Sequence, residues 1–189
     1  MWKNRIHNFI FRWLRPRMLY GVRNNGRYLR NTRISTSTFI AHPANLMLGD
    51  RVYIGHHNFI EASKGITIGE GCQITNFVTI TTHSSHQSIR LYGPHYQSAG
   101  QHTGYVTGPV YIGAYTFIGP YSLLMPGTIV GKGSLIKAGS YLKGEYPDFS
   151  IISGNPATVT GDTRDLDRPL LEENPELANF YRQWANDQE

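Results

Sequence analysis

The sequence predicts an all-β solenoid, and three observations carry the prediction. Aliphatic residues recur at every sixth position through the middle of the chain, a glycine often follows them, and a small or β-branched residue stands four positions after them. A six-residue period matches neither a helix nor a lone strand. A fixed short repeat is typical of a solenoid, in which each coil buries its aliphatic residues against the next.

The aliphatic positions form three runs, which are Leu48, Ile54 and Ile60; Ile68, Ile74 and Ile80; and Ile112, Ile118, Leu124, Val130, Ile136 and Leu142. Six residues are enough for one short strand and one tight corner, so three such sides make a triangular coil. We expect the aliphatic side chains to point inward. We expect the small residues, such as Thr116 and Ser122, to lie at corners where a bulky side chain would clash.

The repeat is interrupted three times. The early run Ile34, Ile40 and Leu46 is out of phase with Leu48 by two residues, and a second shift of two residues lies between Ile60 and Ile68. The third interruption is a long gap between Ile80 and Ile112. A solenoid accommodates an insertion by extruding it at a corner. Long loops of this kind are usually functional. We therefore divide the chain into an N-terminal segment 1–31, a solenoid 32–160 with an extended loop 83–109, and a tail 161–189.

The N-terminal segment is basic, since no acidic residue precedes Asp50. Its apolar residues from Trp2 to Leu14 fall mostly on one face of a predicted helix, which Pro16 ends. Two interpretations stay open, a cap over the first coil and an amphipathic helix on an anionic membrane. The basic stretch is short and accompanies no nucleic-acid-binding motif, so we expect no nucleic-acid partner.

The tail is acidic, and from Pro169 onward it predicts a short helix whose apolar face packs on the last coil. The single cysteine, Cys72, excludes an intramolecular disulfide, and its place in a small-residue slot predicts a buried structural thiol. The sequence has no signal-peptide pattern and no run of 18 apolar residues. We expect a cytoplasmic protein or one at the inner face of the membrane.

The long gap opens with Thr81-Thr82-His83-Ser84-Ser85-His86, a polar cluster where the chain leaves the coil. Histidine is the side chain best suited to exchange protons near neutral pH. A rigid strand end beside such a cluster is a suitable support for a site. His83 and His86 are therefore the candidate catalytic residues.

These repeats, together with the His-containing loop, resemble the hexapeptide-repeat O-acetyltransferases, such as the galactoside, maltose, capsule, O-antigen and colanic acid enzymes. The resemblance implies a left-handed parallel β-helix and a loop histidine that acts as general base. We favour His86 over His83, because a one-residue bulge places His86 at the family's usual position. Where the family often has an acceptor-binding Asn, this chain has Phe77, with Asn76 one residue earlier.

The C-terminal coils carry the most diagnostic part of the resemblance. The segments Ile112–Gly119, Met125–Gly131, Lys137–Ser140 and Ser153–Ala157 match the coils along which coenzyme A lies in the family. Acetyl-CoA is the implied acyl donor, and the implied contacts are Phe117, Gly119, Met125, Gly127, Ala138, Ser140, Lys143, Asn155 and Pro156. The implied acceptor contacts are Asn76, Arg90, Tyr92 and Tyr96.

The resemblance further implies a homotrimer and a carbohydrate acceptor, so we expect acetyl transfer to a sugar hydroxyl of a surface polysaccharide or its lipid-linked precursor. A small soluble sugar, amine or xenobiotic acceptor is the alternative, and a non-catalytic trimeric scaffold is a third hypothesis. The γ-class carbonic anhydrases share the solenoid and bind zinc through histidines. This chain lacks their close His pair within the later repeats, so we expect no metal.

Overall fold

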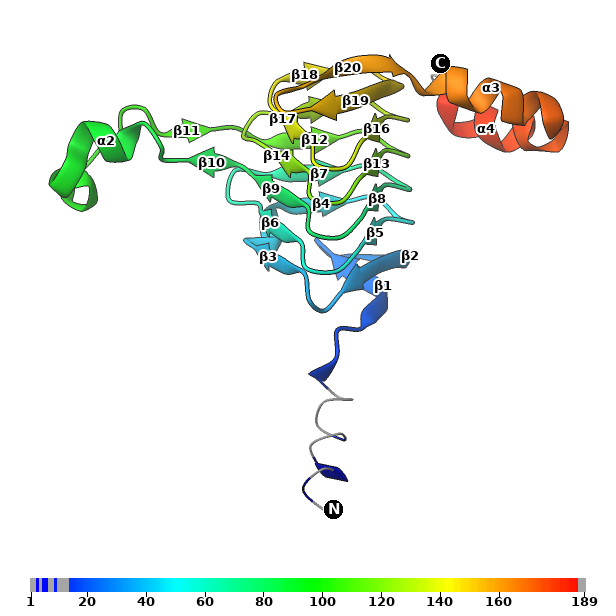
Figure 1. Ribbon diagram of the computed structural model, residues 1–189. Coiled ribbons are helices and arrows are strands. Elements are labelled where there is room, and N and C mark those ends of the chain that lie inside the picture. The colour runs from blue at the N-terminus through cyan, green and yellow to red at the C-terminus, as the bar shows by residue number, and fades with distance from the viewer. Residues whose placement is uncertain (1–2, 4, 7–8, 10–13, 187–189) are drawn as a thin grey trace.

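The computed structural model describes residues 3, 5–6, 9 and 14–186. In this part of the chain, short strands stack into three mainly parallel sheets, here named A, B and C (Figure 1). Successive strands of the repeats pass from one sheet to the next, so the chain runs around a three-sided stack. The predicted all-β stack of parallel strands is confirmed.

Each sheet takes one strand from each coil. Sheet A contains β1 (Met18–Asn24), β2 (Arg27–Ser35), β5 (Tyr53–Ile54), β8 (Gln73–Ile74), β13 (Phe117–Ile118), β16 (Leu135–Ile136), β19 (Ser150–Gly154) and β20 (Ala157–Asp162). Sheet B contains β3 (Phe39–Ala41), β6 (Phe59–Glu61), β9 (Thr79–Thr81), β14 (Leu123–Leu124) and β17 (Tyr141–Leu142). Sheet C contains β4 (Leu46–Leu48), β7 (Ile66–Ile68), β12 (Val110–Ile112), β15 (Ile129–Val130) and β18 (Glu145–Tyr146).

The core is built from columns of aliphatic side chains that stack in register. In sheet A the column is Ile54, Ile74, Ile118, Ile136 and Ile152, and each of these side chains is fully buried. Burying one such side chain contributes about 1.5–3 kcal/mol. The inward direction predicted from the six-residue repeat is therefore confirmed.

The small residues at the corners have a second role beyond avoiding a clash. The hydroxyl of Ser122 donates to the carbonyl of Gly119 at 2.8 Å, and that of Ser140 donates to the carbonyl of Lys137 at 2.6 Å. Both serines are buried. The hydroxyl thus gives a corner carbonyl a hydrogen-bond partner inside the core.

The two-residue shifts in the repeat have a simple structural reason. Strand β4 is three residues long and buries both Leu46 and Leu48, and β7 likewise buries both Ile66 and Ile68. Alternate residues of a strand point to the same face. Sheet C therefore presents two inward residues per strand in these coils, and the apparent change of phase leaves the coil intact.

The N-terminal strands form a hairpin that the sequence analysis did not anticipate. Strands β1 and β2 are antiparallel, and the tip of the hairpin reaches sheet C, where Asn24 and Asn25 donate to the carbonyl of Leu46. Leu29 of the hairpin is buried in the core. The hairpin thus covers the open end of the first coil. Most of the predicted helix from Trp2 to Leu14 lies outside the described residues.

The loop between β9 and β12 forms an arm that extends from the stack (Figure 1). Its base is a two-stranded antiparallel ribbon of β10 (His83–Ser84) and β11 (Val106–Thr107). Its tip carries α2 (Ser88–Tyr92) and the 3-10 helix η2 (Gly93–Ser98). The arm is inserted at the corner between sheets B and C.

The C-terminal end of the stack carries a β-hairpin, and two helices follow it beside the face of sheet A (Figure 1). The predicted Ser153–Ala157 step turns β19 back antiparallel into β20. Helix α3 (Thr163–Glu173) and helix α4 (Ala178–Ala185) follow, with the 3-10 helix η3 (Pro175–Leu177) between them. The first helix begins before the predicted start at Pro169, because the side chain of Asp162 caps its N-terminus by accepting from the amide of Arg164.

Close stacking of the corners predicts that some glycines tolerate no side chain. A Cβ at Gly69 would lie 2.5 Å from the backbone nitrogen of Ala114 in the next coil, whereas a Cβ at Gly100 in the arm would meet nothing within 4 Å. Gly69→Ala should therefore lower the free energy of unfolding by about 1–3 kcal/mol, and Gly100→Ala should not. Urea unfolding measures both, and equal midpoints would contradict the register described above.

Candidate active site

The base of the arm places His83 beside a buried carboxylate. The Nδ1 atom of His83 lies 2.8 Å from Oε2 of Glu61, which is at the end of the neighbouring strand β6. Glu61 is only 6% exposed, whereas the side chain of His83 is 36% exposed. One ring nitrogen of His83 is thus held by the protein, and the ring remains accessible from solvent.

The carboxylate of Glu61 is itself held on both oxygens. Its Oε1 accepts from the backbone amide of Ser63 at 2.9 Å, and its Oε2 accepts from the hydroxyl of Thr82 at 2.7 Å. Burial raises the pKa of Glu61, but the hydrogen bonds from Ser63 and Thr82 outweigh burial and lower the pKa from 4.5 to about 2. The group is therefore an ionised acceptor at neutral pH.

An ionised carboxylate can only accept hydrogen bonds, so it selects the tautomer of His83 with a proton on Nδ1. The Nε2 atom then carries the lone pair, which is the arrangement that a general base requires. The ring of Tyr105, directly before the returning strand β11, stacks on the ring of His83 with centroids 5.6 Å apart. The orientation of His83 is thus fixed by the stack on one side and by the arm on the other.

His86 has a different environment. It is exposed, and its Nδ1 atom lies 2.9 Å from the hydroxyl of Ser84. Its backbone carbonyl accepts a hydrogen bond from the guanidinium of Arg90. No carboxylate among the described residues is bonded to its ring. The two candidate histidines therefore differ in the partner of the ring. Among the described residues, only His83 has a carboxylate that can fix its tautomer.

Two of the predicted acceptor residues, Tyr92 and Tyr96, pack against other residues of the arm. The rings of Tyr96 and His102 have centroids 4.5 Å apart, and Nε2 of His102 is 2.7 Å from the carbonyl oxygen of Tyr96. The hydroxyl of Tyr92 accepts from the amide of Thr103 at 3.0 Å. These contacts give the arm a packed interior. The ring of His102 also lies beside the ring of Tyr105, which in turn stacks on the ring of His83.

The residues predicted to contact the donor fall on two different corners of the coil. Met125, Gly127 and Lys143 lie at the corner between sheets B and C, in the same column of corners as His83. This stacking is shown by the amide of Met125, which donates to the carbonyl of Leu142, and by Gly127, which lies directly against Gly108 at the base of the arm.

The other predicted donor contacts lie on sheet A or at the corner between sheets A and B. Phe117 is on the outer face of β13, and Gly119, Ala138 and Ser140 form stacked corners after β13 and β16. Ser140 is fully buried, so its side chain serves the corner itself. Asn155 and Pro156 are exposed in the turn between β19 and β20.

Asn76 also lies at the corner between sheets A and B. Its Oδ1 atom accepts from the backbone amide of His56 at 2.7 Å, so its side chain links two successive corners. Next to it, Phe77 adopts the left-handed backbone conformation and stacks between His57 and Tyr121, with ring centroids 5.2 and 5.0 Å apart. Strand β9 separates this corner from His83.

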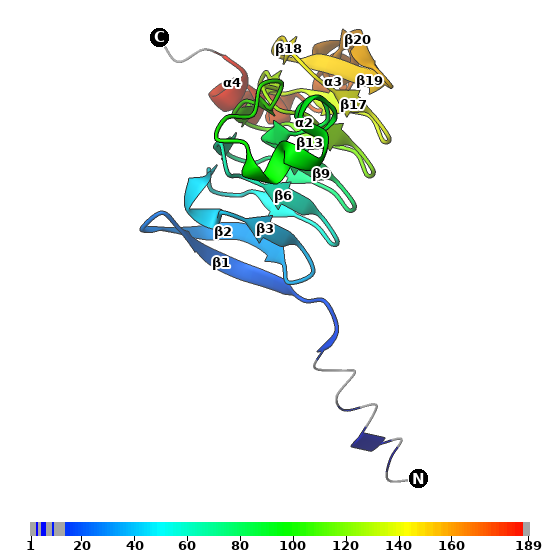
Figure 2. The ribbon, with the colours of Figure 1, turned by 90° about the vertical axis from the view of Figure 1, so that its left-hand side faces the viewer.

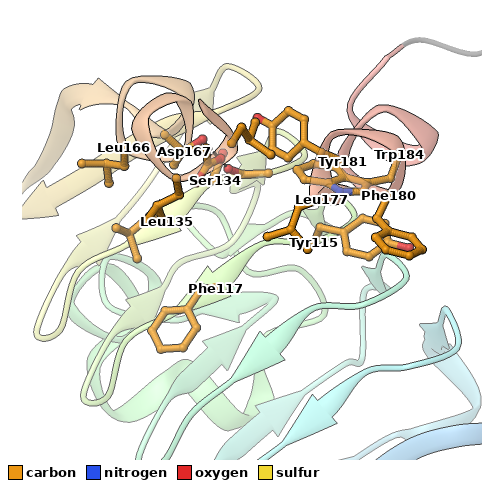
Figure 3. Close-up of a pocket in the computed structure, with 14 residues that line it drawn as sticks. Tyr115, Phe117, Ser134, Leu135, Leu166, Asp167, Leu177, Phe180, Tyr181 and Trp184 are labelled. Atoms are coloured by element: carbon orange, nitrogen blue, oxygen red, sulfur yellow. Dashed lines mark hydrogen bonds between the residues drawn. The ribbon is translucent and has the colours of Figure 1, made fainter. Parts of the chain in front are cut away.

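A hollow lined mostly by apolar side chains lies elsewhere. It has a volume of about 490 Å³ and lies between helices α3 and α4 and the face of sheet A (Figure 3). Trp184 packs there on Tyr115, with centroids 4.8 Å apart, and Phe117 lines the same space. None of its lining residues is at the corner that holds His83, so we regard it as the seam between the tail and the stack.

Burial raises the pKa of Cys72 to about 11, and its thiol lies 3.1 Å from the carbonyl of Gly113, as expected for a structural thiol that stays protonated.

Within residues 3, 5–6, 9 and 14–186, no group of three or more His, Cys, Asp or Glu side chains is placed to hold a metal ion. In the same residues, no helix is long and apolar enough to span a membrane.

Sequence reasoning missed Glu61, although a signal for it exists. Glu61 pairs in register with Thr81, two residues before His83. Once the coils are aligned on Ile60 and Ile80, an acidic residue appears beside the start of the arm. The repeat alone had marked this position only as the end of a strand.

Comparison with known proteins confirms the family resemblance in the C-terminal coils. Residues 109–144 match the family described as bacterial transferase hexapeptide (six repeats). This range contains the repeats from Ile112 to Leu142 on which the resemblance was based. A search of curated proteins finds no match.

Solved structures of the same fold include acyltransferases. A maltose O-acetyltransferase from Clostridium difficile 630 superposes with a TM-score of 0.58 at 22% identity, covering 67% of this chain, and this chain spans only 64% of that protein. AntD, an N-acyltransferase from Bacillus cereus solved with dTDP and 3-hydroxybutyryl-CoA, superposes with a TM-score of 0.60 at 19% identity, covering 76% of this chain and 88% of its own. At these identities the likeness establishes the fold.

The lowered pKa of Glu61 predicts how stability depends on pH. Because the folded-state pKa of about 2 lies below the ordinary value of 4.5, the ionised carboxylate stabilises the fold above pH 4.5, and this contribution is lost as the pH falls from 4.5 to 2. Over this window the wild type should lose up to roughly 3 kcal/mol more unfolding free energy than Glu61→Gln. Urea unfolding at a series of pH values measures the difference, and parallel curves would contradict it.

Proposed function

We propose that this protein is an acetyl-CoA-dependent O-acetyltransferase that acts on a sugar hydroxyl of a surface polysaccharide or its lipid-linked precursor, on the cytoplasmic side of the membrane. The Glu61–His83 pair carries the proposal, because it lies at the base of the arm, which returns directly into the coils that match the hexapeptide transferases. The same resemblance implies the left-handed sense of the coil. Acetyl-CoA is here a substrate.

In the proposed reaction, His83 is the general base. Its Nε2 atom takes the proton of the acceptor hydroxyl as the hydroxyl oxygen attacks the thioester carbonyl. The tetrahedral intermediate then expels the thiolate of coenzyme A, which receives the proton from Nε2. Glu61 keeps its negative charge throughout and stabilises the imidazolium that forms in between. This assignment reverses our preference for His86, because a general base benefits from a partner that fixes its tautomer.

The stacked corners suit a long, thin donor such as acetyl-CoA. A Cβ at Gly127 or at Gly139 would meet nothing within 4 Å, so the backbone of both corners is open to a ligand. Lys143 is exposed at the same column of corners as His83 and is our proposed partner for a donor phosphate. Phe117, Gly119, Ala138, Asn155 and Pro156 remain proposed donor contacts.

The division of these contacts between two corners favours a site shared by copies of the chain. Gly119 and Ala138 precede the strands of sheet B, whereas His83 and Lys143 follow them. A single ligand reaches both groups more readily when the first corner of one copy faces the second corner of its neighbour. This supports the proposed homotrimer, whose mass light scattering in solution measures directly.

The acceptor would bind under the arm. Arg90, Tyr92 and Tyr96 remain the proposed contacts, and Tyr105 joins them because its ring lies on His83. Asn76, which is at the corner between sheets A and B, remains a proposed contact only from a neighbouring copy of the chain. Aromatic rings and polar groups together are suited to the faces and hydroxyls of a sugar. An amino sugar is the alternative acceptor. The likeness in fold to AntD, which is an N-acyltransferase, supports this alternative.

Substitution of the two histidines tests the choice of base. His83→Ala should lower kcat by about 10²–10⁴-fold, and Glu61→Gln should lower it by a smaller factor, while His86→Ala should retain most activity. Release of the coenzyme A thiol from acetyl-CoA measures each rate, with circular dichroism as the control for folding. Full activity in His83→Ala together with loss in His86→Ala would overturn the assignment.

The activity itself is tested with a panel of glycans and amino sugars as acceptors. We expect thiol release that depends on a glycan hydroxyl, and binding of coenzyme A measurable by calorimetry. Release with amino sugars alone would favour the amine alternative. No release with any acceptor and no binding of coenzyme A would leave the non-catalytic scaffold as the better reading.

A further inference from the structure

The hairpin β1–β2 makes one end of the stack strongly basic. Arg23, Arg27 and Arg30 are exposed on it, and none of them has an ion pair with another described residue. The nearest acidic residue in the sequence, Asp50, already accepts hydrogen bonds from the amide and side chain of Asn31. The positive charge of the hairpin is therefore not neutralised within this part of the chain.

The register of the hairpin determines which side chains face outward. Val22 pairs with Leu29, which is buried, so this pair faces the core. The next pair, Arg23 and Tyr28, must face away from the core, because successive residues of a strand alternate. The guanidinium of Arg23 lies 6.0 Å from the ring centroid of Tyr28. Arg30, next to the buried Leu29, faces outward for the same reason.

This basic surface also carries exposed apolar groups. Tyr20 is 73% exposed, Tyr28 is 58% exposed and Leu19 is 52% exposed. A Cβ at Gly21 would come within 2.2 Å of the Tyr28 hydroxyl, so the glycine allows the ring of Tyr28 to lie against the strand. Tyrosine prefers the boundary between water and lipid, and arginine binds anionic headgroups. A surface for phosphates alone would not need the exposed rings.

The segment before the hairpin continues the same pattern. Its described residues include the exposed apolar side chains Ile6, Phe9 and Leu14 and the exposed cations Lys3 and Arg5. The hairpin already covers the first coil, so these apolar groups are not required as its cap. Figure 2 shows the hairpin at the opposite end of the stack from α3, where acidic residues are concentrated.

We propose that the outer face of the β1–β2 hairpin docks on an anionic membrane surface. Arg23 and Arg30 contact lipid phosphates, and Tyr20 and Tyr28 enter the headgroup region. The acidic helix α3 at the far end of the stack then faces away from the membrane. This docking rests on the charge and exposure of the hairpin and does not depend on the acetyl-transfer reaction.

Vesicle flotation of the full chain tests the proposal. The probes are vesicles of phosphatidylcholine mixed with phosphatidylglycerol, and vesicles of phosphatidylcholine alone. We expect binding to the mixed vesicles only, weakened by added salt. Arg23→Gln/Arg30→Gln should bind about 10- to 30-fold more weakly at low ionic strength. The matched control Arg168→Gln/Arg182→Gln removes the same charge at the far end and should bind as the wild type does.

Three outcomes would overturn the proposal. One is no binding of the wild type to mixed vesicles. Another is equal loss in the hairpin and control variants, which would indicate a net-charge effect. The third is duplex DNA binding that requires Arg23 and Arg30 while vesicles are not bound. Tyr28→Ser retains every charge, and we expect it to bind more weakly as well; a variant with unchanged binding would contradict insertion of the ring.

Discussion

Every other feature of this protein depends on the register between successive coils. Ile118 stacks on Ile74 and Ile136, and the same pairing repeats in sheets B and C. Because alternate residues of a strand point to opposite faces, a slip by one residue would expose the whole column to solvent. The corners are equally constrained, since glycines such as Gly69 lie against the backbone of the next coil. A coil held this firmly can extrude an insertion at one corner without losing its own geometry.

The arm uses that rigidity. Glu61 belongs to one coil and His83 to the next, so the register of sheet B sets the 2.8 Å contact between them. The carboxylate is buried at a position where a free charge would be costly, and hydrogen bonds from Ser63 and Thr82 keep it ionised. The arm then adds Tyr105 on the open side of the imidazole. The site thus lies where the arm interrupts the repeat, and the coils on either side of the arm hold its residues in place.

Sequence reasoning succeeded where the same residue type recurs at the same position of each repeat. The inward aliphatic residues, the buried thiol of Cys72 and the extruded segment after Ile80 all follow from the six-residue spacing, because each position recurs with the same environment. It failed where neighbours are distant in sequence. Glu61 stands 22 residues before His83, and no local pattern joins them. The hairpin β1–β2 was missed because most of its residues precede the six-residue repeat and were grouped only by their basic charge, whereas Val22 and Leu29 anchor it on the core.

By itself, the sequence determined that this chain forms stacked parallel coils, where the long insertion leaves them, and that two histidines open that insertion. A six-residue repeat with one inward aliphatic residue fits few structures other than stacked coils. Only the tertiary structure decided which histidine meets a carboxylate, on which corners the predicted donor residues lie, and what covers the first coil. Those three results depend on contacts between coils, and such contacts are set by how many residues each corner contains.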